Sequence, residues 1–249
     1  MMINIIKANF LKNRHSKVII TSCTLSSMYS ILSVLIFLSY ENQSSRQIFK
    51  IYNWFFLGLV ILSQFALSIF IPFLFTPDKE AGNYAYDLRL GVPREKIFVS
   101  KYIYVSIILL IVELISVVLF TFFEFLLGFD QVPILQIILL SFLVFIFLSF
   151  PICIYLIVNY KYSYNGTLLI GVIFSLSGIL LGTTALGTNI WHFFPWTWGI
   201  VACEKLKFGL FNRFEILKFY RIGVICIFLI LIMLLLSTYW FKKAEIKTN

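Results

Sequence analysis

The chain has 249 residues, of which 61% are hydrophobic, 18% aromatic and only 12% charged, and its formal net charge is +9 at pH 7. The charged fraction is about half that of a soluble domain, so the composition excludes a soluble enzyme and predicts an all-α, polytopic membrane protein. In such a protein the excess of Lys and Arg indicates cytoplasmic loops and contact with anionic lipid headgroups rather than nucleic-acid binding.

Residues 1–17 predict a short amphipathic helix that lies along the cytoplasmic membrane interface. Ile3, Ile6 and Phe10 fall at helical spacing, and most of the basic side chains lie off that stripe. A frayed basic tail that only sets the orientation of the chain is the alternative. The basic start is too long for a cleaved signal peptide, so we expect the first apolar run to remain in the mature protein.

Six stretches of the chain are long and apolar enough to cross a bilayer, which takes about 20 mostly apolar residues. Their length and their lack of alternation favour helices over barrel strands. Pro151 lies inside the fourth stretch, where it is expected to bend the helix. The six predicted spanning helices cover residues 18–40, 54–75, 99–127, 134–158, 167–186 and 222–241.

An even number of crossings places both termini on one side of the membrane, and the distribution of Lys and Arg decides which side. Of the 20 basic residues, thirteen fall on the side of the termini and seven on the other. Most of those seven lie in or directly after residues 187–220, a segment expected to be extracellular or re-entrant. The positive-inside rule therefore predicts that both termini are cytoplasmic. The whole chain, residues 1–249, is expected to form a single transmembrane domain.

The sequence contains no motif for catalysis or metal binding. It has no G-x-x-x-x-G-K-[ST] phosphate loop, no H-E-x-x-H and no G-x-S-x-G, and its two histidines, His15 and His192, lie far apart. The four cysteines lack C-x-x-C spacing, and three of them lie in or beside apolar runs. These features favour transport or scaffolding by a chain that binds no metal or cofactor of its own.

The most charge-dense segment is residues 76–101, with five basic and four acidic residues. Gly91 and Pro93 predict a short helix followed by a turn back into the membrane. Asp78 and Glu80 are expected near the start of this helix, where the positive end of the helix dipole stabilises acidic side chains. An ordinary polar connection is the alternative.

Two carboxylates lie within the third apolar run, Glu113 near its middle and Glu124 toward its outer end. They are eleven residues apart, which is about 20° from a whole number of helical turns, so both should face the same side of the helix. A carboxylate in the membrane is costly and is expected to face protein rather than lipid. A cationic peptide substrate would suit this stripe, and an interhelical hydrogen bond to Ser or Thr is the alternative for Glu113. Glu124 could also be shallow enough to reach water.

Residues 191–198, with the sequence WHFFPWTW, hold three of the five tryptophans. Tryptophan favours the membrane interface, so this segment is expected to be a simple aromatic anchor. Upstream of it, Gly171, Ser175, Gly178 and Gly182 form a series of small residues that lets another helix approach closely. Packing within the chain is the favoured interpretation of that series, and a seam between two subunits is the alternative.

The charged loop resembles the first cytoplasmic loop of ABC-2 type (type V) exporter permeases. A basic interfacial helix at the N-terminus and a long segment before the last span also suit that family. Within it, a length near 250 residues and the aromatic segment are similar to permease subunits of lantibiotic immunity transporters. The loop residues that carry the resemblance are Asp78, Glu80, Gly82, Leu88, Leu90, Pro93, Arg94 and Lys101.

The resemblance implies that the loop docks on a separate cytoplasmic ABC ATPase, present in two copies, which binds the ATP and Mg²⁺. It also implies a second permease subunit, a different paralogue, and an amphipathic, lantibiotic-type peptide that is expelled from the bacterial cytoplasmic membrane for self-immunity. The residues assigned to ATPase coupling are Asp78, Glu80, Gly82, Asp87, Arg89, Pro93, Arg94 and Lys101. Those assigned to the substrate pathway are Glu113, Glu124, Trp191, Phe194, Trp196 and Trp198.

Two other functions are compatible with the sequence. The chain could be a bacteriocin-binding immunity or scaffold protein that sequesters a peptide without transporting it. It could also be a membrane-embedded enzyme that uses Glu113 and His192, but Glu113 is expected in the middle of the membrane and His192 outside it, and no third group is spaced to orient either.

Overall fold

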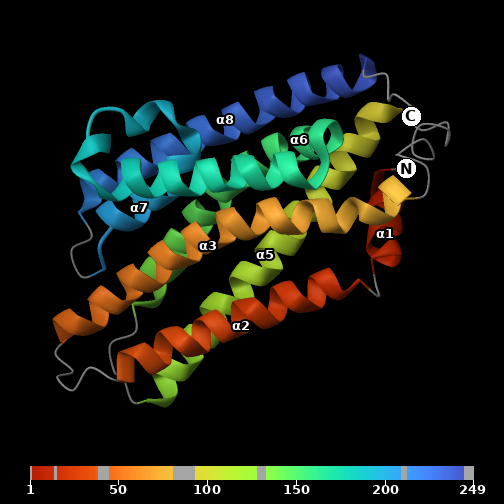
Figure 1. Ribbon diagram of the computed structural model, residues 1–249. Helices are drawn as coiled ribbons and strands as arrows, with labels where there is room; N and C mark the ends of the chain where they lie inside the picture. The colour runs from red at the N-terminus through yellow and green to blue at the C-terminus, as the bar shows by residue number, and fades with distance from the viewer. Residues whose placement is uncertain are drawn as a thin grey trace.

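The computed structural model describes residues 2–13, 16–38, 45–80, 93–127, 133–208 and 212–243, and the regular elements in these ranges are all helices. Figure 1 shows the long helices lying alongside one another in a bundle. The long helices are α2 (Lys17–Leu38), α3 (Ser45–Glu80), α5 (Arg94–Leu126), α6 (Ile134–Thr183) and α8 (Arg213–Lys243). The shorter ones are α1 (Met2–Lys12), η1 (Ala185–Gly187), η2 (Trp191–Phe193), η3 (Pro195–Thr197) and α7 (Trp198–Lys205).

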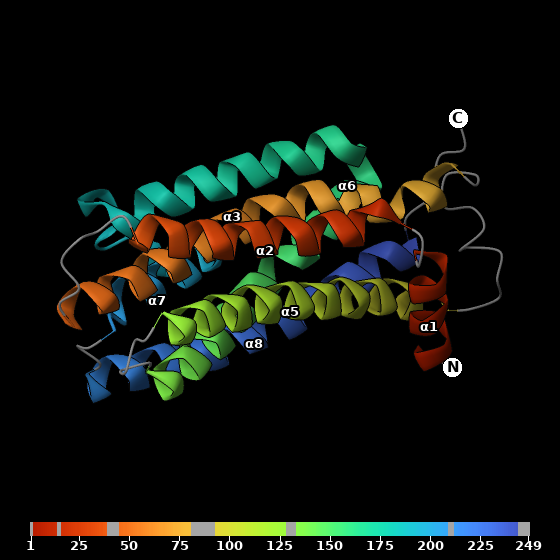
Figure 2. The ribbon, with the colours of Figure 1, turned by 90° about the horizontal axis from the view of Figure 1, so that it is seen from below.

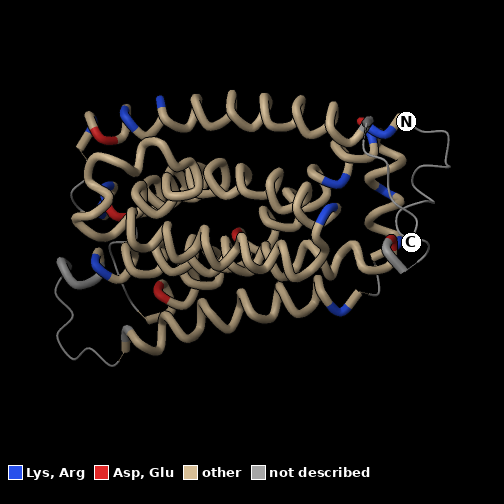
Figure 3. Tube along the Cα trace, turned by 45° about the horizontal axis from the view of Figure 1, so that its top comes forward, with Lys and Arg blue, Asp and Glu red and all other residues tan. Residues whose placement is uncertain are grey.

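Five of the described helices are long and apolar enough to cross a membrane, which makes the chain a multi-pass membrane protein. Figure 3 shows Lys, Arg, Asp and Glu gathered mainly at the two ends of the bundle, with a long and almost uncharged middle. The structure does not give six separate spanning helices, because the fourth and fifth predicted spans both lie in the 50-residue α6. The five candidate spans are Lys17–Ile36, Phe49–Asp78, Arg94–Leu126, Ile134–Thr183 and Arg213–Phe241.

Ser163 interrupts α6 with φ 58° and ψ −153°, which is not a helical conformation. The ring centroids of Tyr155 and Phe174 lie 5.9 Å apart, whereas these two residues would be about 28 Å apart along a straight helix. The element is therefore a hairpin with two antiparallel arms, residues 134–162 and 164–183 (Figures 1 and 2). The backbone dihedral angles stay helical at Pro151 and leave the helical region at Ser163, where the chain reverses direction.

Glycines of the second arm of α6 allow α3 and α7 to pack closely against it. A Cβ atom at Gly171 would lie 2.0 Å from the Oγ of Ser68, and one at Gly182 would lie 2.5 Å from the Cγ2 of Ile200. Gly178 also faces Ile200. At these positions the small residues serve packing within the chain, which is the interpretation favoured from the sequence.

Helices α2 and α5 are joined by hydroxyl groups in an otherwise apolar interface. Ser26 and Ser116 lie 2.6 Å apart through their Oγ atoms, and Ser30 donates to the backbone oxygen of Ser116 at 2.9 Å. Small hydroxyl residues of this kind bring spanning helices together where water offers no alternative partner. Toward its end, α5 also makes an aromatic contact with α3. The stacked rings of Phe120 and Phe55 have their centroids 3.9 Å apart.

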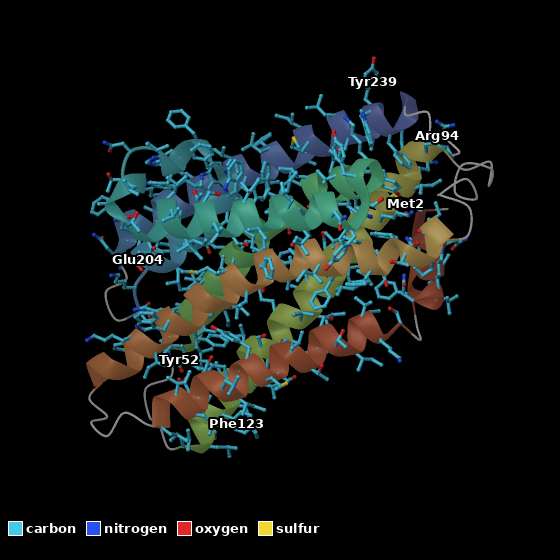
Figure 4. All side chains as sticks on the ribbon, viewed as in Figure 1. Met2, Tyr52, Arg94, Phe123, Glu204 and Tyr239 are labelled. Carbon is cyan, nitrogen blue, oxygen red and sulfur yellow. The ribbon has the colours of Figure 1, made fainter. Side chains whose placement is uncertain are left out.

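Helix α1 lies across one end of the bundle, roughly perpendicular to the long helices (Figure 2). Its Phe10 ring packs edge-on against Tyr104 of α5 at 4.8 Å. The labelled residues Met2, Arg94 and Tyr239 lie toward this end, and Tyr52, Phe123 and Glu204 toward the other (Figure 4). The first helix and the last turns of α8 therefore share one end of the bundle, as an even number of crossings requires.

Candidate functional site

A buried ion-pair cluster lies at the end of the bundle where α3 ends and α5 begins. The Nζ of Lys101 lies 2.8 Å from Oδ2 of Asp78, and Lys12 pairs with the other carboxylate oxygen. Lys101 is only 2% exposed and Asp78 6%. The Lys101 ammonium also lies 4.9 Å from the centroid of the Phe75 ring and 5.2 Å from that of Tyr160. These residues, which we call the Asp78 cluster, tie together α1, α3, α5 and α6.

The Asp78 cluster balances charges that would otherwise be costly to bury. Two ammonium groups face the carboxylate, and aromatic faces attract the ammonium of Lys101 through their π electrons. The expectation that Asp78 and Glu80 start a helix is wrong, because α3 continues through Pro77 and ends at Glu80. Asp78 therefore lies at the negative end of the dipole of α3, where a carboxylate is disfavoured. Lys12 and Lys101 compensate for that position.

The structure brings together only some of the predicted coupling residues. Asp78 and Lys101 meet, while Pro93 is exposed and forms the N-cap of α5, followed by the half-buried Arg94. Glu80 is the last residue of α3. The predicted coupling residues Gly82, Asp87 and Arg89, and the short helix expected around them, lie outside the described residues.

Lys12, Phe75 and Tyr160 were not predicted as site residues. Lys12 carried a signal, because it lies off the apolar stripe of residues 1–17 near the point where the first span begins. The two aromatic residues carried none, since rings near the ends of spans are common in membrane proteins.

Glu113 lies deep in the bundle and is 2% exposed. Neither of its carboxylate oxygens has a hydrogen-bond partner within the described part of the chain. The interhelical hydrogen bond to Ser or Thr, which was the alternative for Glu113, is therefore not formed among these residues. The Cys203 side chain of α7 is close enough to interact electrostatically with it. The carboxylate also lines a groove between α5 and α6. Glu113 is therefore a buried acid that faces protein on one side and a groove on another.

Glu124 lies near the far end of α5 and is 1% exposed. Its position in the sequence allowed contact with water, but the folded chain buries it. Its carboxylate is close to the hydroxyl of Tyr52 on α3, although the two do not reach hydrogen-bond geometry. Tyr52 is itself fully buried, with its ring 5.4 Å from Phe120 and 5.1 Å from Phe208. The Glu124 carboxylate thus sits beside an aromatic cluster, away from the groove that Glu113 lines.

The aromatic segment 191–198 is partly buried, because Trp191 and Trp198 pack inward whereas Phe193 is exposed. Trp191 and Trp198 are each 5% exposed, and Nε1 of Trp198 donates to the backbone oxygen of His192 at 3.2 Å. Trp196 is half-buried, stacks on Phe174 at 4.4 Å and lies 5.0 Å from Phe194. Two of the four aromatic residues assigned to the substrate pathway, Trp191 and Trp198, are therefore part of the core.

His192 stacks on the Trp191 ring at 3.7 Å, and Nζ of Lys218 lies 5.7 Å from the centroid of the same ring. Partial burial, followed by the neighbouring Lys218 ammonium, lowers the pKa of His192 from its usual 6.5. Both effects disfavour the imidazolium form. The Glu113 carboxylate has no hydrogen-bond partner among the described residues, His192 included, so the structure shows no contact of the kind that the enzyme alternative needs.

Within the described ranges, no group of three or more His, Cys, Asp or Glu side chains could hold a metal ion. The model of a family described as ABC-2 family transporter protein matches residues 5–178 of the chain. Among curated proteins, none matches the sequence. The matched region runs from α1 through the α6 hairpin and includes the Asp78 cluster and Glu113.

Proposed function

Because the chain belongs to the ABC-2 family of transporter proteins, we propose that it is the permease subunit of an ABC exporter that removes a membrane-active, lantibiotic-type peptide from the membrane for self-immunity. ABC-2 membership implies a transport component that works with an ABC ATPase. The match covers well over half of the chain and carries the transporter assignment. The peptide substrate rests on the resemblance of the charged loop and the aromatic segment to immunity permeases.

The proposal includes six crossings, with both termini in the cytoplasm of a bacterial cell. The two arms of α6 each have about 20 residues or more, enough for one crossing apiece, and together with α2, α3, α5 and α8 they give an even number. The excess of basic residues at the end of the bundle that holds α1 supports a cytoplasmic position for that end. Helix α1, lying across that end, would then rest along the interface.

The Asp78 cluster is the observation that best supports mechanical coupling. It fixes both ends of the connection between α3 and α5 to each other and to α1, so a push on residues 81–92 moves these helices as one body. We propose that this connection docks on two copies of the ATPase, through Glu80, Asp87, Arg89 and Arg94. The partner ATPase would bind ATP and Mg²⁺, and a second permease, a different paralogue, would complete the pathway.

The proposal is tested by co-expressing the chain with its partner permease and an ABC ATPase encoded beside it. We expect the complex to co-purify, to hydrolyse ATP faster when an amphipathic peptide is added, and to release cell-bound peptide into the medium. Replacing the catalytic glutamate of the ATPase should abolish release. Protection that persists without ATP hydrolysis would instead indicate a protein that sequesters the peptide, and would contradict transport.

The coupling role is tested separately by reversing charges on the loop. The double variant E80K/R94E should dissociate the ATPase or remove peptide stimulation. Lys161→Glu, which changes an exposed basic residue in the turn of the α6 hairpin, serves as the matched control and should leave both unchanged. Labelling of a cysteine introduced at Ala85 from the outside of intact cells would place the loop on the wrong side for any ATPase and would overturn the proposal.

A further inference from the structure

A groove of about 640 Å³ opens on the side of the bundle between α5 and the first arm of α6. The side chains that line it are almost all apolar. Several of these side chains are at least half exposed on the outer surface of the bundle, including Leu114, Val118 and Phe142. Because these helices are the spanning elements, the groove opens toward lipid rather than toward water. Its volume falls within the range of ligand sites in proteins.

Three polar side chains line this groove, and they differ in how well they are satisfied. Thr121 donates to the backbone oxygen of Val117 at 2.9 Å and so bonds to its own helix. The hydroxyl of Ser141 and both carboxylate oxygens of Glu113 have no hydrogen-bond partner among the residues described. A buried polar group without a partner costs free energy, and a carboxylate in hydrocarbon costs most of all. The groove therefore contains two unsatisfied polar groups on facing helices.

The chemistry of the groove selects one class of ligand. Calcium and magnesium ions take six or more oxygen ligands, and zinc sites use three or four protein ligands, whereas the groove offers one carboxylate and one free hydroxyl. A lipid headgroup belongs at the interface, whereas Glu113 lies deep within α5. An ammonium group on an apolar body meets both requirements, because its charge neutralises the carboxylate, its N–H groups can donate to Glu113 and Ser141, and its chain fills the apolar walls.

We propose that this groove binds the protonated amine of a membrane-embedded cationic amphiphile, with Glu113 as its counter-ion and Ser141 as a second acceptor. The ligand enters sideways from the lipid. Identifying this amphiphile with the exported peptide rests on the proposed function, whereas binding itself does not. A lysyl or N-terminal amine of an inserted peptide is the group that would occupy the site during export.

The test uses the purified full chain in lipid nanodiscs without any ATPase. A tetradecylamine carrying a photoreactive diazirine is cross-linked to the chain, and adducts are mapped by mass spectrometry. We expect labelling on α5 and α6 near Leu114 and Phe142, at a concentration about tenfold lower than for the tetradecanol analogue. Unlabelled tetradecylamine should displace the probe, and unlabelled tetradecanol should not. This comparison needs no mutation, so it does not depend on the folding of a variant.

Glu113→Gln should weaken amine labelling about tenfold and leave alcohol labelling unchanged, because it removes the charge and keeps the shape. Glu204→Gln is the control, since Glu204 is an acid of α7 that does not line the groove and pairs with Lys207, and it should label as the original chain does. Equal labelling by amine and alcohol would identify an ordinary lipid-filled groove and overturn the proposal. A groove that no probe labels would also overturn it. Failure of export in the full complex, with amine binding intact, would count against the proposed function alone.

Discussion

The carboxylate of Asp78 and the ammonium of Lys101 lie 2.8 Å apart, one on the last turn of α3 and the other in the first turns of α5. Both side chains are almost fully buried. Twelve residues, 81–92, separate the two helices along the chain and include three of the eight predicted coupling residues, Gly82, Asp87 and Arg89. The pair therefore ties the last turn of α3 to the first turns of α5. Under the proposed function, a displacement of the connection would be passed to both helices together.

Lys101→Met is expected to destabilise the protein by about 3 kcal/mol, because it leaves a buried carboxylate facing only Lys12. Thermal or denaturant unfolding in detergent would measure this. Lys96→Met removes an exposed charge from the same helix and should cost well under 1 kcal/mol. Adding Asp78→Asn to Lys101→Met should cost little more, since the unpaired charge is then gone. Fully additive effects would show that the two residues do not act as a pair.

Lys12→Gln is expected to affect coupling more than stability. The Lys12 side chain is 39% exposed, so its loss should change the free energy of unfolding by less than about 1 kcal/mol. It would release α1 from α3, however, and so reduce peptide-stimulated ATP hydrolysis in the complex with the ATPase. Lys7→Gln, at an exposed position of the same helix, should leave stimulation unchanged. Equal loss in both variants would point to a general effect of positive charge at the membrane surface.

Gly171→Ala should destabilise the bundle by about 1–3 kcal/mol, because its new methyl group would overlap the side chain of Ser68. Removing that side chain with Ser68→Gly should restore part of the loss. Gly223→Ala is the control, since the nearest atom to its added methyl group, Cδ2 of Leu143, lies at ordinary contact distance, 3.4 Å. The melting temperature of each variant in the same detergent would separate these outcomes. If Gly171→Ala were as stable as Gly223→Ala, the close approach of α3 and α6 would be wrong.

Much of the fold could be predicted from hydropathy alone, because long apolar runs have one stable environment. The apolar segments of α2, α5 and α8 were found with errors mainly at their ends. Polar ends such as Arg213–Arg221 were missed, since charged turns extend spanning helices beyond the hydrocarbon without any apolar signal. The two apolar runs predicted as the fourth and fifth spans fall in the two arms of α6, but the helical conformation up to and beyond Ser163 was not expected of a polar stretch between them.

The candidate site was less predictable, because it depends on contacts between distant segments. Sequence reasoning identified Asp78, Lys101 and Glu113 as unusual from their charge and position. It placed Asp78 at the wrong end of a helix, since Pro77 suggested a break and α3 instead continues through it. The pairing with Lys12 joins two elements whose meeting follows only from the packed bundle. Likewise, no pattern could tell that Trp191 and Trp198 are core residues whereas Phe193 is 79% exposed.

Ser163→Gly is expected to stabilise the protein by about 1 kcal/mol. At φ 58° and ψ −153°, Ser163 occupies a region of backbone conformation that is essentially restricted to glycine, so its Cβ atom carries strain that glycine would relieve. Ser27→Gly, in the regular part of α2, is the opposite control and should cost about 0.5 kcal/mol. Unfolding of both variants in the same detergent would measure the difference. If Ser163→Gly proved as destabilising as Ser27→Gly, residue 163 would have to be an ordinary helical residue, and α6 would have to be a continuous helix about 75 Å long. A helix of that length cannot fit within one bilayer crossing, so the sign of this single change distinguishes a hairpin from a rod.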